Sequence, residues 1–149
     1  MWINKHTTPN RIFEKLSDFP EITHGFVYLI TVKLSEEKTV HYIGKKNLRT
    51  VKKKLLTIDK LPNDKRKRNY EYVKKESDWL TYNSSCKELK YIIGSKKFIS
   101  IEKQILKLSK NDRELSYQEA RQIMIHNALV DTNFLNAGFS FKCIGKLKF

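Results

Sequence analysis

Two tyrosines and a lysine lie in one short region of the chain, where they could act together on a substrate. Tyr28 lies within residues 26–30, a stretch of aromatic and β-branched side chains, and Tyr42 lies within a second such stretch, residues 40–46. A phenol has a reference pKa of about 10, so it acts as a base at neutral pH only where a nearby cation lowers that pKa. Lys45 could supply this cation, or it could bind an anionic group of the substrate.

The two stretches are typical of a β-hairpin, with the polar residues 34–38 as its turn. Side chains alternate between the two faces of a strand, so the register decides whether the tyrosines meet. An odd loop, residues 35–37, places Ile30 opposite Tyr42 and makes Tyr28 a diagonal neighbour on the same face. An even loop sends the two hydroxyl groups to opposite faces. A cross-strand aromatic contact that only holds the sheet together is the alternative role.

A carboxylate later in the chain, Glu119, has two possible roles. Ser116 and Glu119 have the spacing of a helix capping box, in which the glutamate accepts a backbone hydrogen bond and needs no other function. A lone carboxylate combined with phosphate oxygens and waters also suits Mg²⁺ (or Mn²⁺), because Mg²⁺ keeps much of its hydration shell. The pattern alone leaves both roles open.

These motifs, in this order, resemble the GIY-YIG nucleases, and most closely the Seg-type branch of free-standing homing endonucleases carried by phages. Val27-Tyr28 stands where the family has Ile-Tyr. The other landmarks are Tyr-Ile-Gly-Lys-Lys at residues 42–46, Ser-Asp-Trp-Leu-Thr-Tyr at residues 77–82 and Tyr-Gln-Glu-Ala at residues 117–120. The similarity covers residues 25–136, which is most of the chain.

The resemblance implies a metal-dependent endonuclease that hydrolyses DNA phosphodiester bonds, in phage-encoded homing or in DNA degradation. It implies that Tyr28 and Tyr42 are the signature tyrosines, that Lys45 assists them, and that Glu119 is the metal ligand. It also implies an asparagine that closes the site, which we assign to Asn136.

The family commonly has an arginine on a helix about two turns beyond the signature glycine. In this chain that register holds Lys52, with Arg49 one turn earlier, so the identity of the phosphate clamp is open. Arginine binds phosphate with two parallel hydrogen bonds and lysine does not, so we assign the clamp to Arg49.

The formal net charge is +14, and the positive residues concentrate between Lys45 and Lys75. This asymmetry favours a polyanionic partner, DNA first, with RNA not excluded. We expect residues 59–76 to form a mobile basic loop. The residues expected to bind the nucleic-acid backbone are Lys46, Lys52, Lys53, Lys65, Arg66, Lys67 and Arg68.

Three other classes are less compatible with the sequence. No apolar run approaches the ~20 residues that span a bilayer, and no signal-peptide core is present, so we expect a cytoplasmic protein without a membrane partner. Cys86 and Cys143 lie far apart without neighbouring zinc ligands, which argues against a zinc site or a disulfide scaffold. The remaining alternatives are a non-catalytic basic nucleic-acid-binding protein and an RNA-directed nuclease.

The predicted architecture is a small α/β (α+β) domain at residues 25–149, following an N-terminal extension at residues 1–24. Its mainly antiparallel three-stranded sheet combines the hairpin with a strand at residues 98–108, and helices flank it. Ile101, Ile105 and Leu108 would also suit a helix, but the β-branched start of the segment and the resemblance favour the strand. Leu48, Val51, Leu55 and Ile58 have helical spacing and would face inward. The predicted helices are residues 11–19, 47–58, 86–93 and 116–130, and residues 139–144 are a possible last strand.

Overall fold

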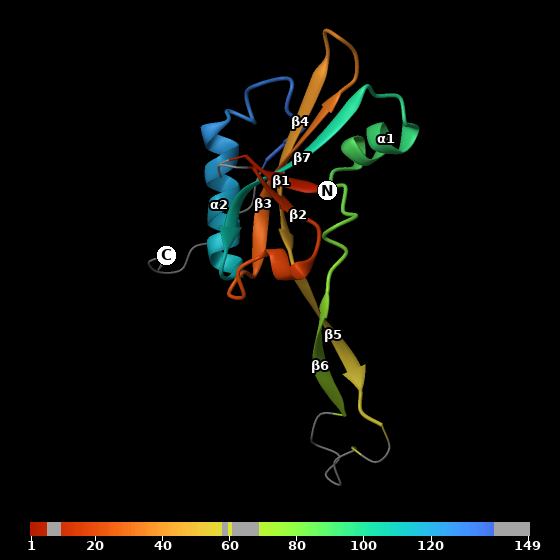
Figure 1. Cartoon of the computed structure of the whole chain (residues 1–149), viewed down its shortest axis with the longest axis vertical. Coiled ribbons are helices and arrows are strands. Elements are labelled where there is room, and N and C mark those ends of the chain that lie inside the picture. Colours follow the sequence, from red (N-terminus) through yellow and green to blue (C-terminus); the bar gives the residue numbers. More distant parts are fainter. Residues whose placement is uncertain (6–9, 58–59, 61–68, 139–149) are drawn as a thin grey trace.

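The computed structural model describes residues 1–5, 10–57, 60 and 69–138 (Figure 1). Its main sheet has five strands in the order β2-β1-β7-β3-β4, so that the β3–β4 hairpin forms one side of it, and β5 and β6 form a separate two-stranded sheet. The elements are β1 (Trp2–Asn4), β2 (Arg11–Phe13), the 3-10 helix η1 (Leu16–Asp18), β3 (Gly25–Lys33), β4 (Thr39–Asn47), β5 (Arg49–Leu55), β6 (Tyr70–Glu76), α1 (Lys87–Ser95), β7 (Ser100–Ser109) and α2 (Asp112–Ile125).

The predicted hairpin is confirmed as β3 and β4, and of the two registers considered it has the one with an odd loop. The strands pair from Gly25 with Asn47 to Lys33 with Thr39, and Ile30 lies opposite Tyr42. The backbone N–H groups of both Leu34 and Ser35 donate to the carbonyl of Lys38, which closes the turn. The predicted third strand is also confirmed as β7, which pairs antiparallel with β3 on its other side.

The N-terminal residues form strands, so the predicted helix at residues 11–19 is wrong. β1 pairs in parallel with β7 and antiparallel with β2, and this turns the predicted three-stranded sheet into a mixed five-stranded one. Burial explains this outcome, because Trp2 is fully buried and its indole N–H donates to the carbonyl of Trp79 at 2.9 Å. Phe13 also packs on Phe19, with ring centroids 4.4 Å apart.

Residues 47–57 do not form the predicted helix, because the chain continues from β4 into the strand β5, and Ile58 lies outside the described residues. Leu48 is buried as predicted, but Val51 and Leu55 are 58% and 71% exposed. β5 pairs along its whole length with β6, which lies inside the segment predicted to be a mobile loop. The two strands project as an arm from the rest of the protein (Figure 1).

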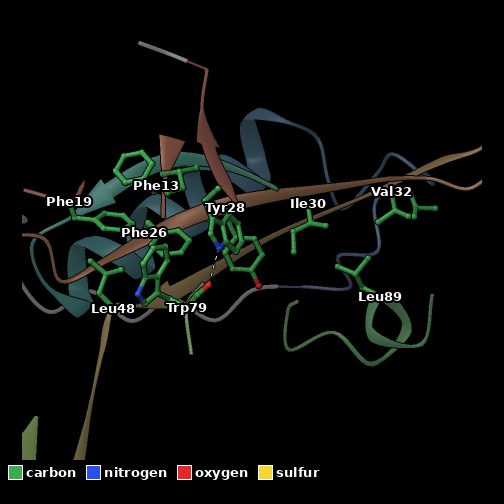
Figure 2. Packing of buried hydrophobic residues seen from close by; sticks show 12 residues of the cluster. Phe13, Phe19, Phe26, Tyr28, Ile30, Val32, Leu48, Trp79 and Leu89 are labelled. Carbon is green, nitrogen blue, oxygen red and sulfur yellow. Dashed lines mark hydrogen bonds between the residues drawn. The ribbon is translucent and has the colours of Figure 1, made fainter. Parts of the chain in front are cut away.

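The sheet has an apolar layer on each face. The face that carries Phe26, Tyr28 and Ile30 packs against Trp79 and Leu89 (Figure 2). The other face carries Val27 and Ile43 and packs against Leu115 and Ile123 of α2, among others. Each face of the sheet is therefore packed against its own cluster of apolar residues, and β4 is an edge strand with one cluster on each side.

Both helices begin and end at residues other than those predicted. α1 has Cys86 as its N-cap and contains Gly94, and Lys96 in the left-handed conformation ends it. α2 begins at Asp112 with Asn111 as N-cap and ends at Ile125, so Ser116 lies inside the helix rather than at its cap. Ala120 and Ile123 of α2 are buried as predicted, whereas Met124 and Leu129 are exposed. The possible last strand at residues 139–144 lies outside the described residues.

Candidate active site

Tyr28 and Tyr42 lie on the same face of the sheet, as neighbours on β3 and β4. Tyr28 lies opposite Gly44, and its ring centroid is 6.3 Å from that of Tyr42. A Cβ atom at position 44 would lie only 2.5 Å from the Tyr28 hydroxyl oxygen and 2.7 Å from Cζ. A glycine is therefore required at position 44 for the Tyr28 ring to rest against β4.

Neither tyrosine has the lowered pKa that a base needs at neutral pH. The side chain of Tyr28 is 1% exposed, and burial raises the pKa of Tyr28 far above its usual value, although a hydrogen bond with Ser84 opposes that shift. Burial also raises the pKa of Tyr42, and the negative charge of Glu119 adds to the effect. The pKa of both phenols is shifted upward, opposite to the lowering expected of Lys45 in one of its two possible roles.

Glu119 and Lys45 form an ion pair on the opposite face of the sheet. Lys45 Nζ lies 3.0 Å from Glu119 Oε2 and donates a hydrogen bond to Ser116 Oγ at 2.9 Å. The Glu119 side chain is 16% exposed. Because α2 begins four residues before Ser116, Glu119 does not cap the helix, and the capping-box interpretation is wrong. The carboxylate is held by a lysine instead, and it is close enough to influence Tyr42 around the edge of β4.

The chain after α2 runs along the outer edge of β4. The side chain of Asn136 makes two hydrogen bonds with one residue: its Oδ1 accepts from Ile43 N at 3.0 Å, and its Nδ2 donates to Ile43 O at 2.8 Å. Asn133 O accepts from His41 N, and Leu135 N donates to His41 O. Asn136 therefore fixes the backbone between Tyr42 and Gly44. Beyond Ile43, where Lys45 is located, no described strand pairs with this edge of β4, although Asn47 O accepts a hydrogen bond from Ser77 Oγ.

The family model described as "Putative endonuclease segE, GIY-YIG domain" matches residues 6–138. The chain belongs to this GIY-YIG endonuclease family. The match confirms the resemblance predicted from the Tyr42-Ile43-Gly44 motif and the later landmarks. No significant match is found among curated proteins or among solved structures.

Two serines of this GIY-YIG domain contact the tyrosines and were missed by the sequence analysis. Ser84 is fully buried and hydrogen-bonds with both Tyr28 and Tyr42, while Ser85 hydrogen-bonds with Tyr42. Ser84 has a φ of 105°, which is unfavourable for a residue with a side chain, and its Oγ accepts from Cys86 N at 3.0 Å. Their only sequence signal is a polar run before α1, which is typical of any turn.

Lys46, predicted to bind nucleic acid, lies on the same face of β4 as Tyr42 and contacts the segment that packs over Tyr28. Its side chain is 14% exposed, and its Nζ lies 2.5 Å from Asp78 Oδ1 and 3.9 Å from the centroid of the Tyr82 ring. Tyr82 in turn lies 6.0 Å from Tyr28 between ring centroids, and its carbonyl accepts from Lys103 Nζ at 2.8 Å. Lys46 therefore holds the segment that covers Tyr28.

The other predicted cations lie on the arm, away from the tyrosines. Arg49 lines a hollow with His24 and Lys110, whereas Lys52 lines another with Ser77 and Asp78. Lys53 Nζ lies 4.7 Å from the centroid of the Tyr70 ring. The structure thus brings Tyr28, Tyr42, Lys45, Glu119 and Asn136 together around β4 and leaves Arg49 out. Lys65, Arg66, Lys67 and Arg68 lie outside the described residues.

Glu119 is the carboxylate at this site that could bind a divalent cation. No group of three or more His, Cys, Asp or Glu side chains gathers in the described part of the chain. A single carboxylate fits a largely hydrated Mg²⁺ or Mn²⁺ whose remaining ligands are water and substrate oxygens. Neither of the two described helices is long and apolar enough to span a membrane.

Proposed function

We propose that the protein is a metal-dependent endonuclease that hydrolyses phosphodiester bonds in DNA. Membership of the GIY-YIG endonuclease family supports cleavage of nucleic acid. The observation that carries the proposal is that candidate catalytic side chains on both faces of the sheet lie at the same edge strand, β4. The paired tyrosines approach β4 from one face, and Glu119 with Lys45 approaches it from the other.

The tyrosines would position the reacting groups rather than remove protons. Burial raises the pKa of Tyr28, so this phenol stays neutral and fixes the packing against Gly44 and Tyr42. Tyr42 is less buried and lies at the strand edge, where its hydroxyl group can hydrogen-bond with a water molecule or with a phosphate oxygen. Ser84 and Ser85 hold the Tyr42 hydroxyl in place for this role.

Glu119 would hold the cation, and Lys45 would contact the phosphate when the substrate displaces it from the ion pair. A divalent cation at Glu119 would neutralise charge on the phosphate and the leaving oxygen. Lys45 orients Glu119 before substrate binds, because its ammonium group lies 3.0 Å from the carboxylate. A preoriented, charged carboxylate needs little rearrangement to bind the cation.

The biological role that we propose follows from the family: phage-encoded homing or DNA degradation in the cytoplasm of a host cell. The net charge of +14 supports a nucleic-acid partner. A non-catalytic basic protein would share that charge, so only a cleavage assay separates the two functions.

The test is plasmid nicking by the wild-type protein and by Glu119→Gln, each with Mg²⁺ and with EDTA. Glutamine keeps the size of the side chain and removes its charge, so we expect nicking to slow by at least about 100-fold. Glu102→Gln is the matched control, since Glu102 is also a carboxylate paired with a lysine, Lys5 at 2.7 Å, but it lies on β7.

The control is expected to cut DNA like the wild type, and all three proteins are expected to bind DNA with similar salt dependence. Equal nicking by the wild type and Glu119→Gln would overturn the role of Glu119. Salt-sensitive binding without cleavage by the wild type in any metal would support the non-catalytic protein.

A further inference from the structure

The arm formed by β5 and β6 has the shape of an isolated antiparallel ribbon. Each strand has seven residues, and every residue of one is paired with a residue of the other, from Arg49–Glu76 to Leu55–Tyr70. Figure 1 shows the ribbon extending away from the sheet and both helices. No other described strand pairs with either of its edges. The base of the arm lines hollows with residues outside it, such as His24 and Asp78.

The base of the arm is fixed to the site. Leu48, between β4 and β5, is buried, and its N–H donates to His24 O at 3.0 Å. Ser77, directly after β6, donates from N to Leu48 O at 2.9 Å and from Oγ to Asn47 O at 2.6 Å. The direction of the arm relative to Tyr42 and Glu119 is therefore set by packing and hydrogen bonds, as expected for an element that positions a substrate.

One face of the ribbon, which we call the apolar face, combines exposed apolar and positive side chains. Residues directly opposite each other share a face, and alternate residues along each strand do so too. On the apolar face, Val51 is 58% exposed, Leu55 71% and Tyr72 55%. Its members by register are Arg49, Val51, Lys53 and Leu55 of β5 with Tyr70, Tyr72, Lys74 and Glu76 of β6; Glu76, at the base of the arm, accepts a hydrogen bond from Trp79 Nε1 at 2.7 Å. Charges alone would suffice for phosphate binding, so the exposed apolar side chains require another explanation.

We propose that this ribbon lies in the major groove of double-stranded DNA, with the apolar face against the base edges. The inference rests on the proposed function in taking DNA as the substrate. Two strands about 4.8 Å apart fit a groove about 12 Å wide, which admits a two-stranded ribbon. Valine and leucine can contact the methyl group of thymine, and Arg49 can donate to guanine. The major groove of duplex RNA is deep and narrow, so the ribbon selects DNA.

The position of the ribbon predicts where the groove contact lies. Arg49 and Leu55 follow Gly44 by five and eleven residues, which is about 17 and 36 Å along an extended chain. At 3.4 Å per base pair, the contact spans about 5 to 11 base pairs to one side of the cut. Base recognition therefore lies up to one helical turn from the cleaved bond.

The test measures dissociation constants of the Glu119→Gln protein by fluorescence anisotropy at one salt concentration. The probes are a 30-base-pair DNA duplex, the same duplex with a bulky substituent at C5 of its pyrimidines, the same duplex saturated with a minor-groove ligand, and duplex RNA of that sequence. The C5 substituents block the major groove and leave the phosphates unchanged. We expect at least about tenfold weaker binding to the blocked duplex and to RNA, and less than a twofold change with the minor-groove ligand. Equal affinity for the blocked and unblocked duplexes would overturn the proposal.

Two variants of unchanged charge test the apolar face itself. Val51→Ser combined with Leu55→Ser is expected to reduce the preference for DNA over RNA by at least about fivefold, with RNA binding unchanged. Val73→Ser lies on the opposite face of the ribbon and is the matched control, expected to keep the preference within twofold. Loss of preference in the control alone would contradict the assignment of the faces.

The two proposals fail in distinguishable ways. If the protein does not cut DNA, the major-groove dependence of binding is still expected. If it cuts DNA but binds the blocked duplex normally, the ribbon proposal is wrong and the nuclease proposal stands. Binding to RNA as tight as to DNA would favour an RNA-directed partner and would also overturn the ribbon proposal.

Discussion

Replacing Gly44 with alanine should destabilise the protein, although replacing a glycine within a strand by alanine usually increases stability. The new Cβ would lie 2.5 Å from Tyr28 Oη, 2.7 Å from Tyr28 Cζ and 2.9 Å from Tyr42 Cε1. Ordinary contacts begin at 3.4 Å, so the Tyr28 ring must move by about 1 Å. β4 cannot yield easily, because β3 holds one edge and Asn136 the other.

Overpacking of this kind costs about 1–3 kcal/mol, and alanine regains about 0.5–1 kcal/mol of strand propensity. Because Tyr28 is fully buried and β4 is held on both edges, the cost lies in the upper part of that range, about 2–3 kcal/mol, and the net loss of unfolding free energy is about 1–2.5 kcal/mol. In a chain of 149 residues, this lowers the Tm by about 2–10 °C. Urea denaturation and thermal melting, both followed by circular dichroism, measure the two quantities.

Gly94→Ala is the matched control for Gly44→Ala. No atom lies within 4 Å of a Cβ at Gly94, which is inside α1, so this variant should gain about 0.5–1 kcal/mol. Adding Tyr28→Phe to Gly44→Ala removes the closest contact and should recover part of the loss in a double-mutant cycle. A Gly44→Ala protein as stable as the wild type, or the same loss in the Tyr28→Phe background, would refute the reasoning.

Two further predictions concern the same side of the sheet. Because burial raises the folded-state pKa of Tyr28 and Tyr42, the unfolded chain loses protons first as the pH rises past about 10, and stability should fall there by up to about 1.4 kcal/mol per pH unit for each tyrosine. Urea titrations between pH 8 and 11 test this, and an unchanged pH profile in Tyr28→Phe would show that Tyr28 contributes nothing. Asn136→Ala leaves the backbone of Ile43 without two partners and should cost about 1–3 kcal/mol with slower nicking. Asn136→Ala with wild-type stability would indicate that water replaces the amide.

The tyrosine hairpin could be predicted because it depends on neighbouring residues only. The sequence leaves its register open between an odd and an even loop, and the structure has the odd loop, in which strict alternation places Tyr28 and Tyr42 on one face. β7 could be predicted from its β-branched start only together with the family resemblance, because Ile101, Ile105 and Leu108 also have helical spacing, and the structure pairs it with β3.

β5 could not be predicted because its apolar pattern fits both kinds of element. Leu48, Val51 and Leu55 have helical spacing, yet Val51 and Leu55 also lie on one face of a strand. The decision comes from pairing with β6, which begins fifteen residues after β5 ends. The secondary-structure propensities of residues 49–55 do not indicate whether a partner strand such as β6 is present.

The start of α2 was missed because two capping signals overlap. Asn111 and Glu114 have the same spacing as Ser116 and Glu119, and the structure uses the first pair. Asn111 Oδ1 accepts from Glu114 N at 2.9 Å, while Glu114 Oε2 accepts from Lys110 N at 2.8 Å. The earlier start adds a turn that buries Leu115 against the sheet. The choice therefore follows from tertiary burial, which also leaves Glu119 without a capping role.

The strand geometry of β5 decides which cation can reach a phosphate at the tyrosines. On a helix, Lys52 would lie about 12 Å from Gly44, within reach of its side chain, because each residue adds 1.5 Å. On a strand, its eight residues of separation span about 26 Å, and the five residues to Arg49 span about 17 Å. Lys46 is nearer, but it is held by Asp78 and Tyr82. Lys45 is therefore the cation best placed for the phosphate, so Lys45→Met should slow cleavage far more than Arg49→Met, which should chiefly weaken DNA binding.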